Sequence, residues 1–350
     1  MANMNDYLDW RGDLTIDRDG FNDIDNVILS WLATLDLSGG VQSSIADAAG
    51  GLLRARRVDE DEPLLGRLFS SKRFQNVKLL DFTELFDEGE QMQFAAFAAD
   101  TGEEVFIAFR GTDNTLVGWK EDFNMAFMQS VPAQRESVKY VKKIAAMTDK
   151  PLMIGGHSKG GNLAVYSACH CPEDIQKRVS RVYNNDGPGL SEEIMESGEY
   201  KAVSDRIRTF LPQSSIVGIL LYHTEDYRVV RSTAIGPLQH HPSSWQVMGN
   251  SFVFEGELRK GSRYMDKTLK KWLESMSVDE RRVMVDAIYD VMAAAEIKTF
   301  HDLIANWRAS GGAIIKAAAG LPPEKRQVLK RVLGELVSAG IENVHPPRDE

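Results

Sequence analysis

Residues 152–161 read LMIGGHSKGG, an apolar run that ends in two pairs of glycines on either side of a serine. Within it, Gly156-His157-Ser158-Lys159-Gly160 fits the pattern G-x-S-x-G. A strand that turns this sharply into a helix forces its middle residue into a strained conformation and lifts its hydroxyl clear of the backbone. Larger side chains at Gly156 and Gly160 would clash in such a turn. The stretch predicts Ser158 as a catalytic nucleophile, with a tightly packed or phosphate-binding turn as the alternative.

The chain on both sides of this stretch alternates between strand-like and helix-like segments. Asp100-Thr101-Gly102 separates two strand-like runs and reads as a hairpin turn. Further short apolar runs follow at 152–155, 181–185, 207–211 and 227–231, with helical or turn segments between them. This alternation predicts an α/β protein with a mostly parallel sheet that is covered on both faces.

The texture of the sequence predicts three regions. Residues 1–90 form an N-terminal lead-in of helices and loops that packs on the core, residues 91–250 form an α/β-hydrolase core, and residues 251–350 form a helical appendage. In the last region Ser277 and Glu280 make a capping box at the start of a helix. A final helix is expected to begin near Pro323 and to end at Gly340.

Charge and composition exclude several classes of partner. With 51 acidic against 41 basic residues, the formal net charge is −10, which argues against nucleic acid as a partner. The longest clean apolar run, 216–222, is far shorter than the roughly 20 residues that span a bilayer. The first residues show neither the basic nor the apolar part of a signal peptide, so we expect a cytoplasmic protein. Cys169 and Cys171 lack the spacing of a disulfide or a metal site, and we predict no metal.

A second element of a hydrolase site lies after the strand predicted at 105–109. An oxyanion hole needs one N–H from the residue after the nucleophile, here Lys159, and another from a loop after an earlier strand, for which Thr112 is suited. Arg110 and Asp122 are expected to pair and brace this loop. The Lys159 side chain either attracts an anionic substrate or assists the oxyanion, or it is solvated and contributes only its N–H.

At this point the motifs resemble those of a known group of proteins. The residues Phe109-Arg110-Gly111-Thr112, Trp119 and Asp122, and then Gly156-His157-Ser158 with Gly160-Gly161, are similar to the ordered motifs of class-three, fungal-type lipases. The chain more closely resembles a bacterial Mbeg-like α/β-hydrolase family of unknown function over roughly residues 5 to 300. The matching segments are Asp6 to Leu8, Gly156 to Asn162, Asn184 to Gly189, Pro212 to Gly218, and Gln239-His240 with Trp245. The resemblance implies the fold and a hydrolase-type site, without a substrate.

The catalytic base is expected late in the chain, because hydrolases of this fold carry their triad in the order Ser, acid, His. His240 lies in a loop after the last predicted strand, and the lipase-like pattern of a histidine followed by tryptophan fits His240 and Trp245. We favour His240 as the base and keep His241 as the alternative.

The catalytic acid is harder to assign. The resemblance to class-three lipases implies an aspartate after the strand 207–211, but residues 212–215 read PQSS and contain no carboxylate. Asp186 ends the preceding strand and is our first candidate, although it also suits a turn that begins the Gly-Pro loop. Asp226 is the reserve candidate.

These residues together predict a serine hydrolase without metal or organic cofactor that acts on a small-molecule ester or acyl substrate. Two alternatives stay open. One is an inactive descendant of the fold that serves as a scaffold or binds a partner, and the missing carboxylate after residue 211 favours it. The other is an acyltransferase or peptidase that uses the same residues.

Overall fold

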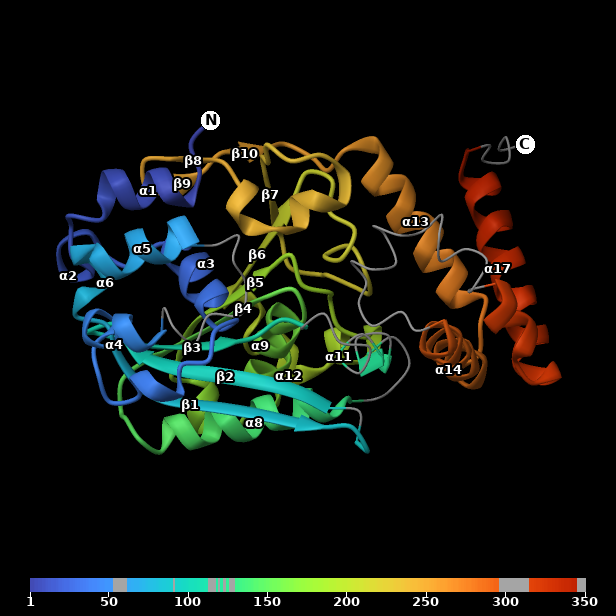
Figure 1. Ribbon diagram of the computed structural model, residues 1–350, viewed down its shortest axis with the longest axis horizontal. Coiled ribbons are helices and arrows are strands. Elements are labelled where there is room, and N and C mark those ends of the chain that lie inside the picture. Colours follow the sequence, from blue (N-terminus) through green and yellow to red (C-terminus); the bar gives the residue numbers. More distant parts are fainter. Residues whose placement is uncertain are drawn as a thin grey trace. The chain divides into compact units, whose positions relative to one another are not determined.

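The computed structural model describes residues 1–52, 62–90, 92–112, 118, 120–121, 124–125, 130–295 and 315–344. Its largest element is an eight-stranded sheet in the order β1-β2-β3-β4-β5-β6-β7-β10 (Figure 1). The strands β3 to β7 are parallel to one another, whereas β2 and β10 run antiparallel to their neighbours β3 and β7. The predicted α/β class with a mostly parallel sheet is therefore confirmed. The strands are β1 (Lys78–Asp87), β2 (Met92–Asp100), β3 (Val105–Phe109), β4 (Leu152–His157), β5 (Val179–Asn185), β6 (Ile207–Pro212), β7 (Tyr227–Val230) and β10 (Phe254–Glu255).

The first strand, β1, falls in a region for which the sequence predicted only helices and loops. It lies at one end of the strand order, and most of its residues are half-buried or exposed. An edge strand carries polar and charged side chains, so it shows a weaker apolar pattern than a central strand. The central strand β3, by contrast, is buried at every residue and reads as a continuous apolar run.

The chain divides into two compact units. The first consists of residues 1–85, 94–111 and 133–259, and the second of residues 86–93, 112–132 and 260–350. Helices of the first unit are α1 (Met4–Arg11), α2 (Ile16–Asp19), α3 (Asp23–Leu32), α4 (Ile45–Leu52), α5 (Glu62–Ser70), α6 (Lys72–Gln75), α8 (Pro132–Ala145), α9 (Lys159–His170), α10 (Glu173–Gln176), α11 (Glu192–Glu196) and α12 (Gly198–Lys201). A small hairpin of β8 (Val247–Met248) and β9 (Ser251–Phe252) completes it.

Two helices cover opposite faces of the sheet at the strand that precedes Ser158. A side chain on Gly155 would meet the amide oxygen of Asn26 in α3, and one on Gly156 would meet the backbone of Gly160 in α9. Successive residues of a strand point to opposite faces, so α3 and α9 lie on the two sides of β4. Figure 1 shows the same layering.

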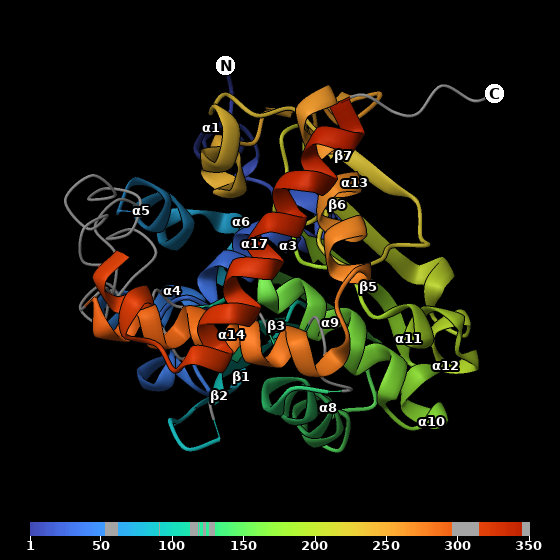
Figure 2. The same cartoon turned by 90° about the vertical axis from the view of Figure 1, so that its right-hand side faces the viewer.

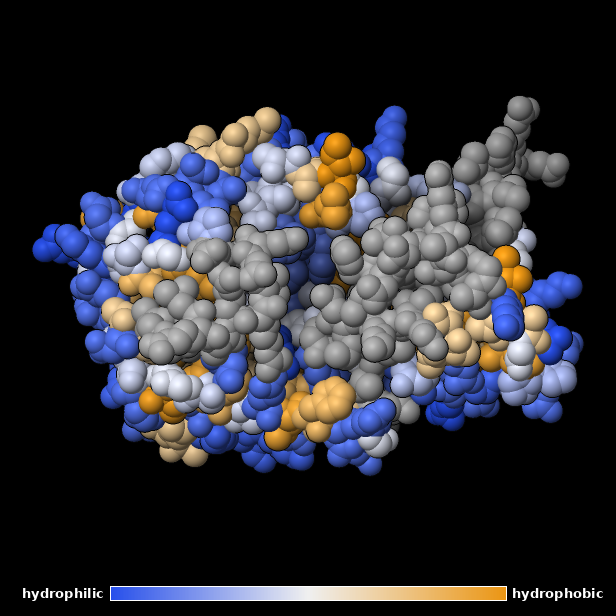
Figure 3. Space-filling view, viewed as in Figure 1, coloured by the Kyte–Doolittle hydropathy of each residue, from blue (hydrophilic) through white to orange (hydrophobic). Residues whose placement is uncertain are grey.

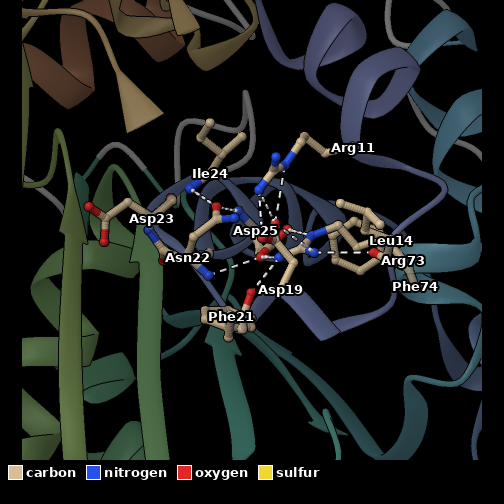
Figure 4. A network of polar contacts seen from close by, with 12 residues as sticks. Arg11, Leu14, Asp19, Phe21, Asn22, Asp23, Ile24, Asp25, Arg73 and Phe74 are labelled. Atoms are coloured by element: carbon tan, nitrogen blue, oxygen red, sulfur yellow. Dashed lines mark hydrogen bonds and ion pairs between the residues drawn. The ribbon is translucent and has the colours of Figure 1, made fainter. Parts of the chain in front are cut away.

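A buried polar network connects helices α1, α3 and α6 of the N-terminal segment (Figure 4). The guanidinium of Arg73 in α6 donates to both carboxylate oxygens of Asp25 in α3, at 2.6 and 2.5 Å, and neither side chain is exposed. The Tyr7 hydroxyl in α1 donates to the same carboxylate at 2.8 Å. Asp25 also accepts the backbone N–H of Asn22, which caps α3. Three helices that are distant in sequence are thus held by one carboxylate.

The second unit contains the helices α13 (Lys260–Glu274), α14 (Val278–Ala294) and α17 (Pro323–Val344), which pack together (Figure 2). The predicted capping box of Ser277 and Glu280 is confirmed at the start of α14. The predicted end of the last helix at Gly340 is wrong, because α17 continues to Val344. A glycine inside a helix costs only about 1 kcal/mol and does not have to end it.

Candidate active site

Ser158 lies at the turn between β4 and α9, as the sequence predicted. Its backbone has φ 58° and ψ −132°, in the positive-φ region that non-glycine residues rarely adopt, at a cost of about 1–3 kcal/mol. Two hydrogen bonds hold this conformation: the Ser158 N–H donates to the carbonyl of Asn185 at 3.0 Å, and the Ser158 carbonyl accepts from Gly161 at 2.9 Å. The turn therefore has the strained geometry of a nucleophile elbow.

The glycines around Ser158 are there because the backbone passes too closely for a side chain. A Cβ on Gly156 would lie 2.2 Å from the backbone of Gly160, and a Cβ on Gly160 would lie 2.1 Å from the carbonyl oxygen of Phe109. A Cβ on Gly111 would approach the Ser158 Cβ to 3.2 Å. The end of β3 therefore runs directly against the nucleophile turn.

Asp186 follows directly after β5 and is completely buried. Its φ of 50° is a left-handed conformation that aspartate tolerates better than most residues, and its N–H donates to the carbonyl of Phe210 in β6 at 2.8 Å. One carboxylate oxygen contacts Nδ1 of His240 at 2.6 Å, and the other accepts from the hydroxyl of Ser215 at 2.5 Å. Asp186 and His240, 54 residues apart in sequence, thus form a charge-assisted hydrogen bond.

His240 ends a short 3-10 helix, Gly236–His240, and its side chain is 29% exposed. The preceding Gln239 fixes this segment, since its carbonyl accepts from the indole N–H of the buried Trp245 at 2.9 Å. The Gln239 side chain also accepts from the backbone of Ser214 at 2.8 Å. The histidine ring is therefore presented from a segment that several hydrogen bonds hold in place.

His157, the residue before the nucleophile, contacts His240 directly. Its Nε2 lies 2.8 Å from the carbonyl oxygen of His240, and the two rings are 4.5 Å apart between centroids. Burial, and then the charge of the His240 ring, hold the pKa of His157 well below its usual range. A neutral His157 has one N–H, which must lie on Nε2 because a carbonyl only accepts. This contact was not predicted from the sequence, where its only signal was the position of a histidine beside Ser158.

The Ser158 hydroxyl makes no hydrogen bond to His240 among the described residues. The structure thus brings together Asp186 and His240, the candidate acid and base, and it places His240 against His157, the residue before Ser158. Hydrogen bonds of a catalytic site are often long or poorly aligned before substrate binds. The Ser158–His240 pair therefore stays a prediction.

The reserve candidates lie elsewhere. His241 is exposed, and its Nδ1 contacts the hydroxyl of Ser243 at 2.7 Å. Asp226 is exposed and precedes β7, whereas Asp186 follows the carboxyl end of β5. Because β5, β6 and β7 are parallel, Asp226 lies at the opposite edge of the sheet from Asp186.

Of the residues predicted to form or support the oxyanion hole, the structure describes Lys159, Thr112 and Arg110. Lys159 is the first residue of α9, but its side chain is only 1% exposed, so the expectation that it is solvated is wrong. The start of α9 packs against β3, β4 and β5, and Lys159 is buried there. Thr112 is half-buried and its oxyanion role stays a prediction. Arg110 donates to Glu84 of β1 at 2.8 Å, and Asp122 lies outside the described residues.

Neither cysteine is disulfide-bonded, and both Cys169 and Cys171 are buried. Burial raises the pKa of the Cys171 thiol to about 11. In the described parts of the chain, no three His, Cys, Asp or Glu side chains come together as metal ligands. No described helix has the length and apolar character needed to cross a bilayer.

The strand order, with a sharp strand–serine–helix turn after the central β4, defines an α/β-hydrolase type of fold with additional C-terminal helices. A family model described as Mbeg1-like matches residues 68–290, and the chain belongs to this family. The resemblance that the motifs indicated is thereby confirmed, over a shorter span than the expected residues 5 to 300.

No curated protein sequence matches the chain. The chain is similar to the crystal structure of M37 lipase at 16% identity and a TM-score of 0.36, over 55% of this chain and 68% of that one. It is similar to the native Rhizomucor miehei lipase propeptide complex at 15% identity and a TM-score of 0.37, over 60% of this chain and 68% of that one. It is also similar to a mutant form of MDLA from Penicillium cyclopium at 14% identity and a TM-score of 0.39, over 64% of this chain and 83% of that one.

Proposed function

We propose that the protein is a serine hydrolase that cleaves carboxylic esters with Ser158 as nucleophile, His240 as base and Asp186 as acid. One observation carries the proposal: the 2.6 Å hydrogen bond between a fully buried Asp186 and His240, whose ring lies against the residue that precedes Ser158. A buried carboxylate behind an imidazole orients the ring and stabilises its charged form.

In the proposed reaction, the Ser158 oxygen attacks the ester carbonyl while His240 removes the hydroxyl proton. The N–H groups of Thr112 and Lys159 stabilise the oxyanion, with help from the N-terminus of α9. His240 then protonates the leaving alcohol. Water, deprotonated by the same histidine, then attacks the acyl-enzyme, which releases the carboxylic acid product and restores the Ser158 hydroxyl.

Exposed apolar side chains beside the base support an ester with an apolar acyl chain. Ile235 is 79% exposed and Leu238 is 72% exposed, and both lie on the loop that ends at His240. On the face drawn in Figure 3, the coloured surface is mostly hydrophilic, with several apolar patches among the polar residues.

A fluorophosphonate probe and p-nitrophenyl butyrate together test the proposal. Wild-type protein should be labelled once and should hydrolyse the ester, and Ser158→Ala should abolish both. Asp186→Asn should reduce kcat by about 10⁴-fold, because the histidine is then held in the wrong tautomer.

Matched controls are available in the same segments. His241→Gln and Asp226→Asn should keep activity near the wild-type value, whereas His240→Gln should lose it. His241 is exposed and its Nδ1 contacts Ser243, and Asp226 is exposed at the opposite ends of the strands from Asp186. Absence of labelling in a folded wild-type sample would count decisively against a hydrolase. An Asp186→Asn variant that hydrolyses the ester as fast as wild type would exclude Asp186 as the catalytic acid.

A catalytically inactive scaffold is the second candidate function. It is favoured by the lack of a hydrogen bond between Ser158 and His240 among the described residues. The same probe distinguishes it, because a scaffold would leave Ser158 unlabelled at probe concentrations that saturate an active serine hydrolase.

A further inference from the structure

The carboxylate of Asp186 has a second partner that the triad does not account for. Its Oδ2 contacts His240, and its Oδ1 accepts the hydroxyl of Ser215 at 2.5 Å. Both Asp186 and Ser215 are buried. We propose that Ser215 is a positioning residue of the active site: its hydroxyl holds the Asp186 carboxylate in the orientation and charge state that His240 requires. This inference rests on the proposed function.

The hydrogen bonds around Ser215 determine where its single proton points. The Ser215 oxygen accepts the backbone N–H of Gly218 at 3.0 Å, and the Ser215 N–H donates to the carbonyl of Pro212 at 2.9 Å. A serine hydroxyl has one proton to donate, and carboxylate oxygens accept only. The proton is therefore directed at Asp186, where the bond is charge-assisted and strong.

The Asp186–Ser215 pair is closed off from solvent by the loop that follows β6. A Cβ on Gly218 would lie 2.4 Å from the carboxylate oxygen of Asp186 and 2.9 Å from the hydroxyl oxygen of Ser215. The backbone of the loop thus closes over the pair, and Asp186 has no exposed surface. Removing the hydroxyl leaves a buried carboxylate oxygen without its donor, which costs more than losing an exposed hydrogen bond.

The loop that carries Ser215 is itself anchored at its far end. The carbonyl of Gly218 contacts Nε2 of His223 at 2.7 Å, and Nδ1 of His223 contacts Glu225 at 2.9 Å. Glu225 also accepts from Thr209 of β6 at 2.6 Å and from Tyr200 at 2.7 Å. Burial acts to raise the pKa of Glu225, but the bonds and charge of these partners, His223 first, lower it to about 2. A charged anchor thus keeps the turn at Gly218 in place.

The two residues of this pair come from the ends of two neighbouring strands. Asp186 follows β5 and Ser215 follows β6, and these strands are parallel with Asn185 beside Phe210. Parallel strands end at the same edge of the sheet, so the carboxylate from one and the hydroxyl from the next meet there. The position after β6, where no carboxylate exists, supplies the donor instead.

Ser215→Ala, Ser215→Thr and the adjacent Ser214→Ala form a matched set. With p-nitrophenyl butyrate, Ser215→Ala should lower kcat by about 10- to 100-fold with KM nearly unchanged, the effect of losing one hydrogen bond to a buried charge. Ser215→Thr, which keeps a hydroxyl, should recover most of the rate. Ser214→Ala removes a hydroxyl from the same turn and should behave as wild type.

A second readout needs no substrate: the proton NMR resonance of the His240 Nδ1 proton, identified by its loss in His240→Gln. It should shift in Ser215→Ala and stay in place in Ser215→Thr and Ser214→Ala. An unshifted resonance in Ser215→Ala, or an unchanged kcat, would overturn the role of Ser215. If wild type is neither labelled nor active but the resonance shifts, the proposed function fails while the coupling of Ser215 to Asp186 stands.

Discussion

The buried ion pair between Asp25 and Arg73 should be among the largest single contributions to the stability of the first unit. The change to make is Asp25→Asn, which keeps the shape of the side chain and removes its charge. Arg73 would then remain as a fully buried guanidinium whose other neighbours are the carbonyls of Leu14 at 3.2 Å and Gly20 at 2.6 Å and, more distant at 3.7 Å, the carboxylate of Asp19.

The size of the effect follows from the contacts. Asp25→Asn weakens two hydrogen bonds from Arg73, at 2.6 and 2.5 Å, and a third from the Tyr7 hydroxyl. Breaking one partner of a buried pair costs about 3–5 kcal/mol, and here it leaves a buried guanidinium without its principal partner, with only Asp19 at 3.7 Å as a remaining carboxylate. With total stabilities of about 5–15 kcal/mol, that loss is a large fraction, and it should lower the urea midpoint by about 1–2 M.

Urea unfolding at pH 7, followed by tryptophan fluorescence, measures the loss for Asp25→Asn, Arg73→Met and the double variant. The double variant should lose at least about 2 kcal/mol less than the sum of the single losses, since each single change strands the other charge. The exposed pair of Arg67 and Asp9, at 2.9 Å, is the control, and Arg67→Met should cost less than about 1 kcal/mol. If Asp25→Asn costs no more than this control, the reasoning about the buried network is refuted.

Three further outcomes follow from single sites. Gly111→Ala should slow fluorophosphonate labelling of Ser158 by on the order of 100-fold, because the new Cβ meets the nucleophile turn, and a wild-type labelling rate would contradict this. The carboxyl of Glu225 has its pKa lowered from 4.5 to about 2, so its stabilisation of about 3 kcal/mol is present above pH 4.5 and is lost as the pH falls towards 2. The urea-unfolding free energies of wild type and Glu225→Gln should therefore converge by about 2 kcal/mol between pH 7 and pH 3, and a constant gap would exclude this linkage. The buried Cys171 thiol, with its pKa raised to about 11, should react with a thiol reagent at pH 7.5 only after unfolding, and rapid reaction of the native protein would show that it is accessible.

Much of the fold could be read from local patterns. The central strands are buried on both faces, so β3 and β4 stand out as continuous apolar runs, and the glycines around Ser158 mark the sharp turn that follows β4. The edge strand β1 carries no such run and was missed. The end of α17 was misjudged at Gly340 because one glycine weakens a helix without ending it.

The candidate site divides in the same way. The turn at Ser158 is a local structure, because steric contacts within a few residues impose it, and the amino-acid sequence was sufficient to predict it. The sequence offered two carboxylates and two histidines for the rest of the predicted triad, and it favoured Asp186 over Asp226 only because Asp186 ends a predicted strand. In the structure, the parallel strands bring Asp186 and His240 together at one edge of the sheet and leave Asp226 at the other.

The contacts of His157 and Ser215, and the burial of Lys159, likewise depend on segments that are distant in sequence. A histidine within G-x-S, a serine in a loop and a lysine beside a nucleophile have no pattern that reveals their partners or their burial. Such roles arise from close packing of segments that are tens of residues apart, and side-chain periodicity carries no information about that distance. Local steric contacts can thus be predicted from the sequence. The partners of buried charges and hydrogen-bond donors depend instead on which strand ends the folded sheet brings together.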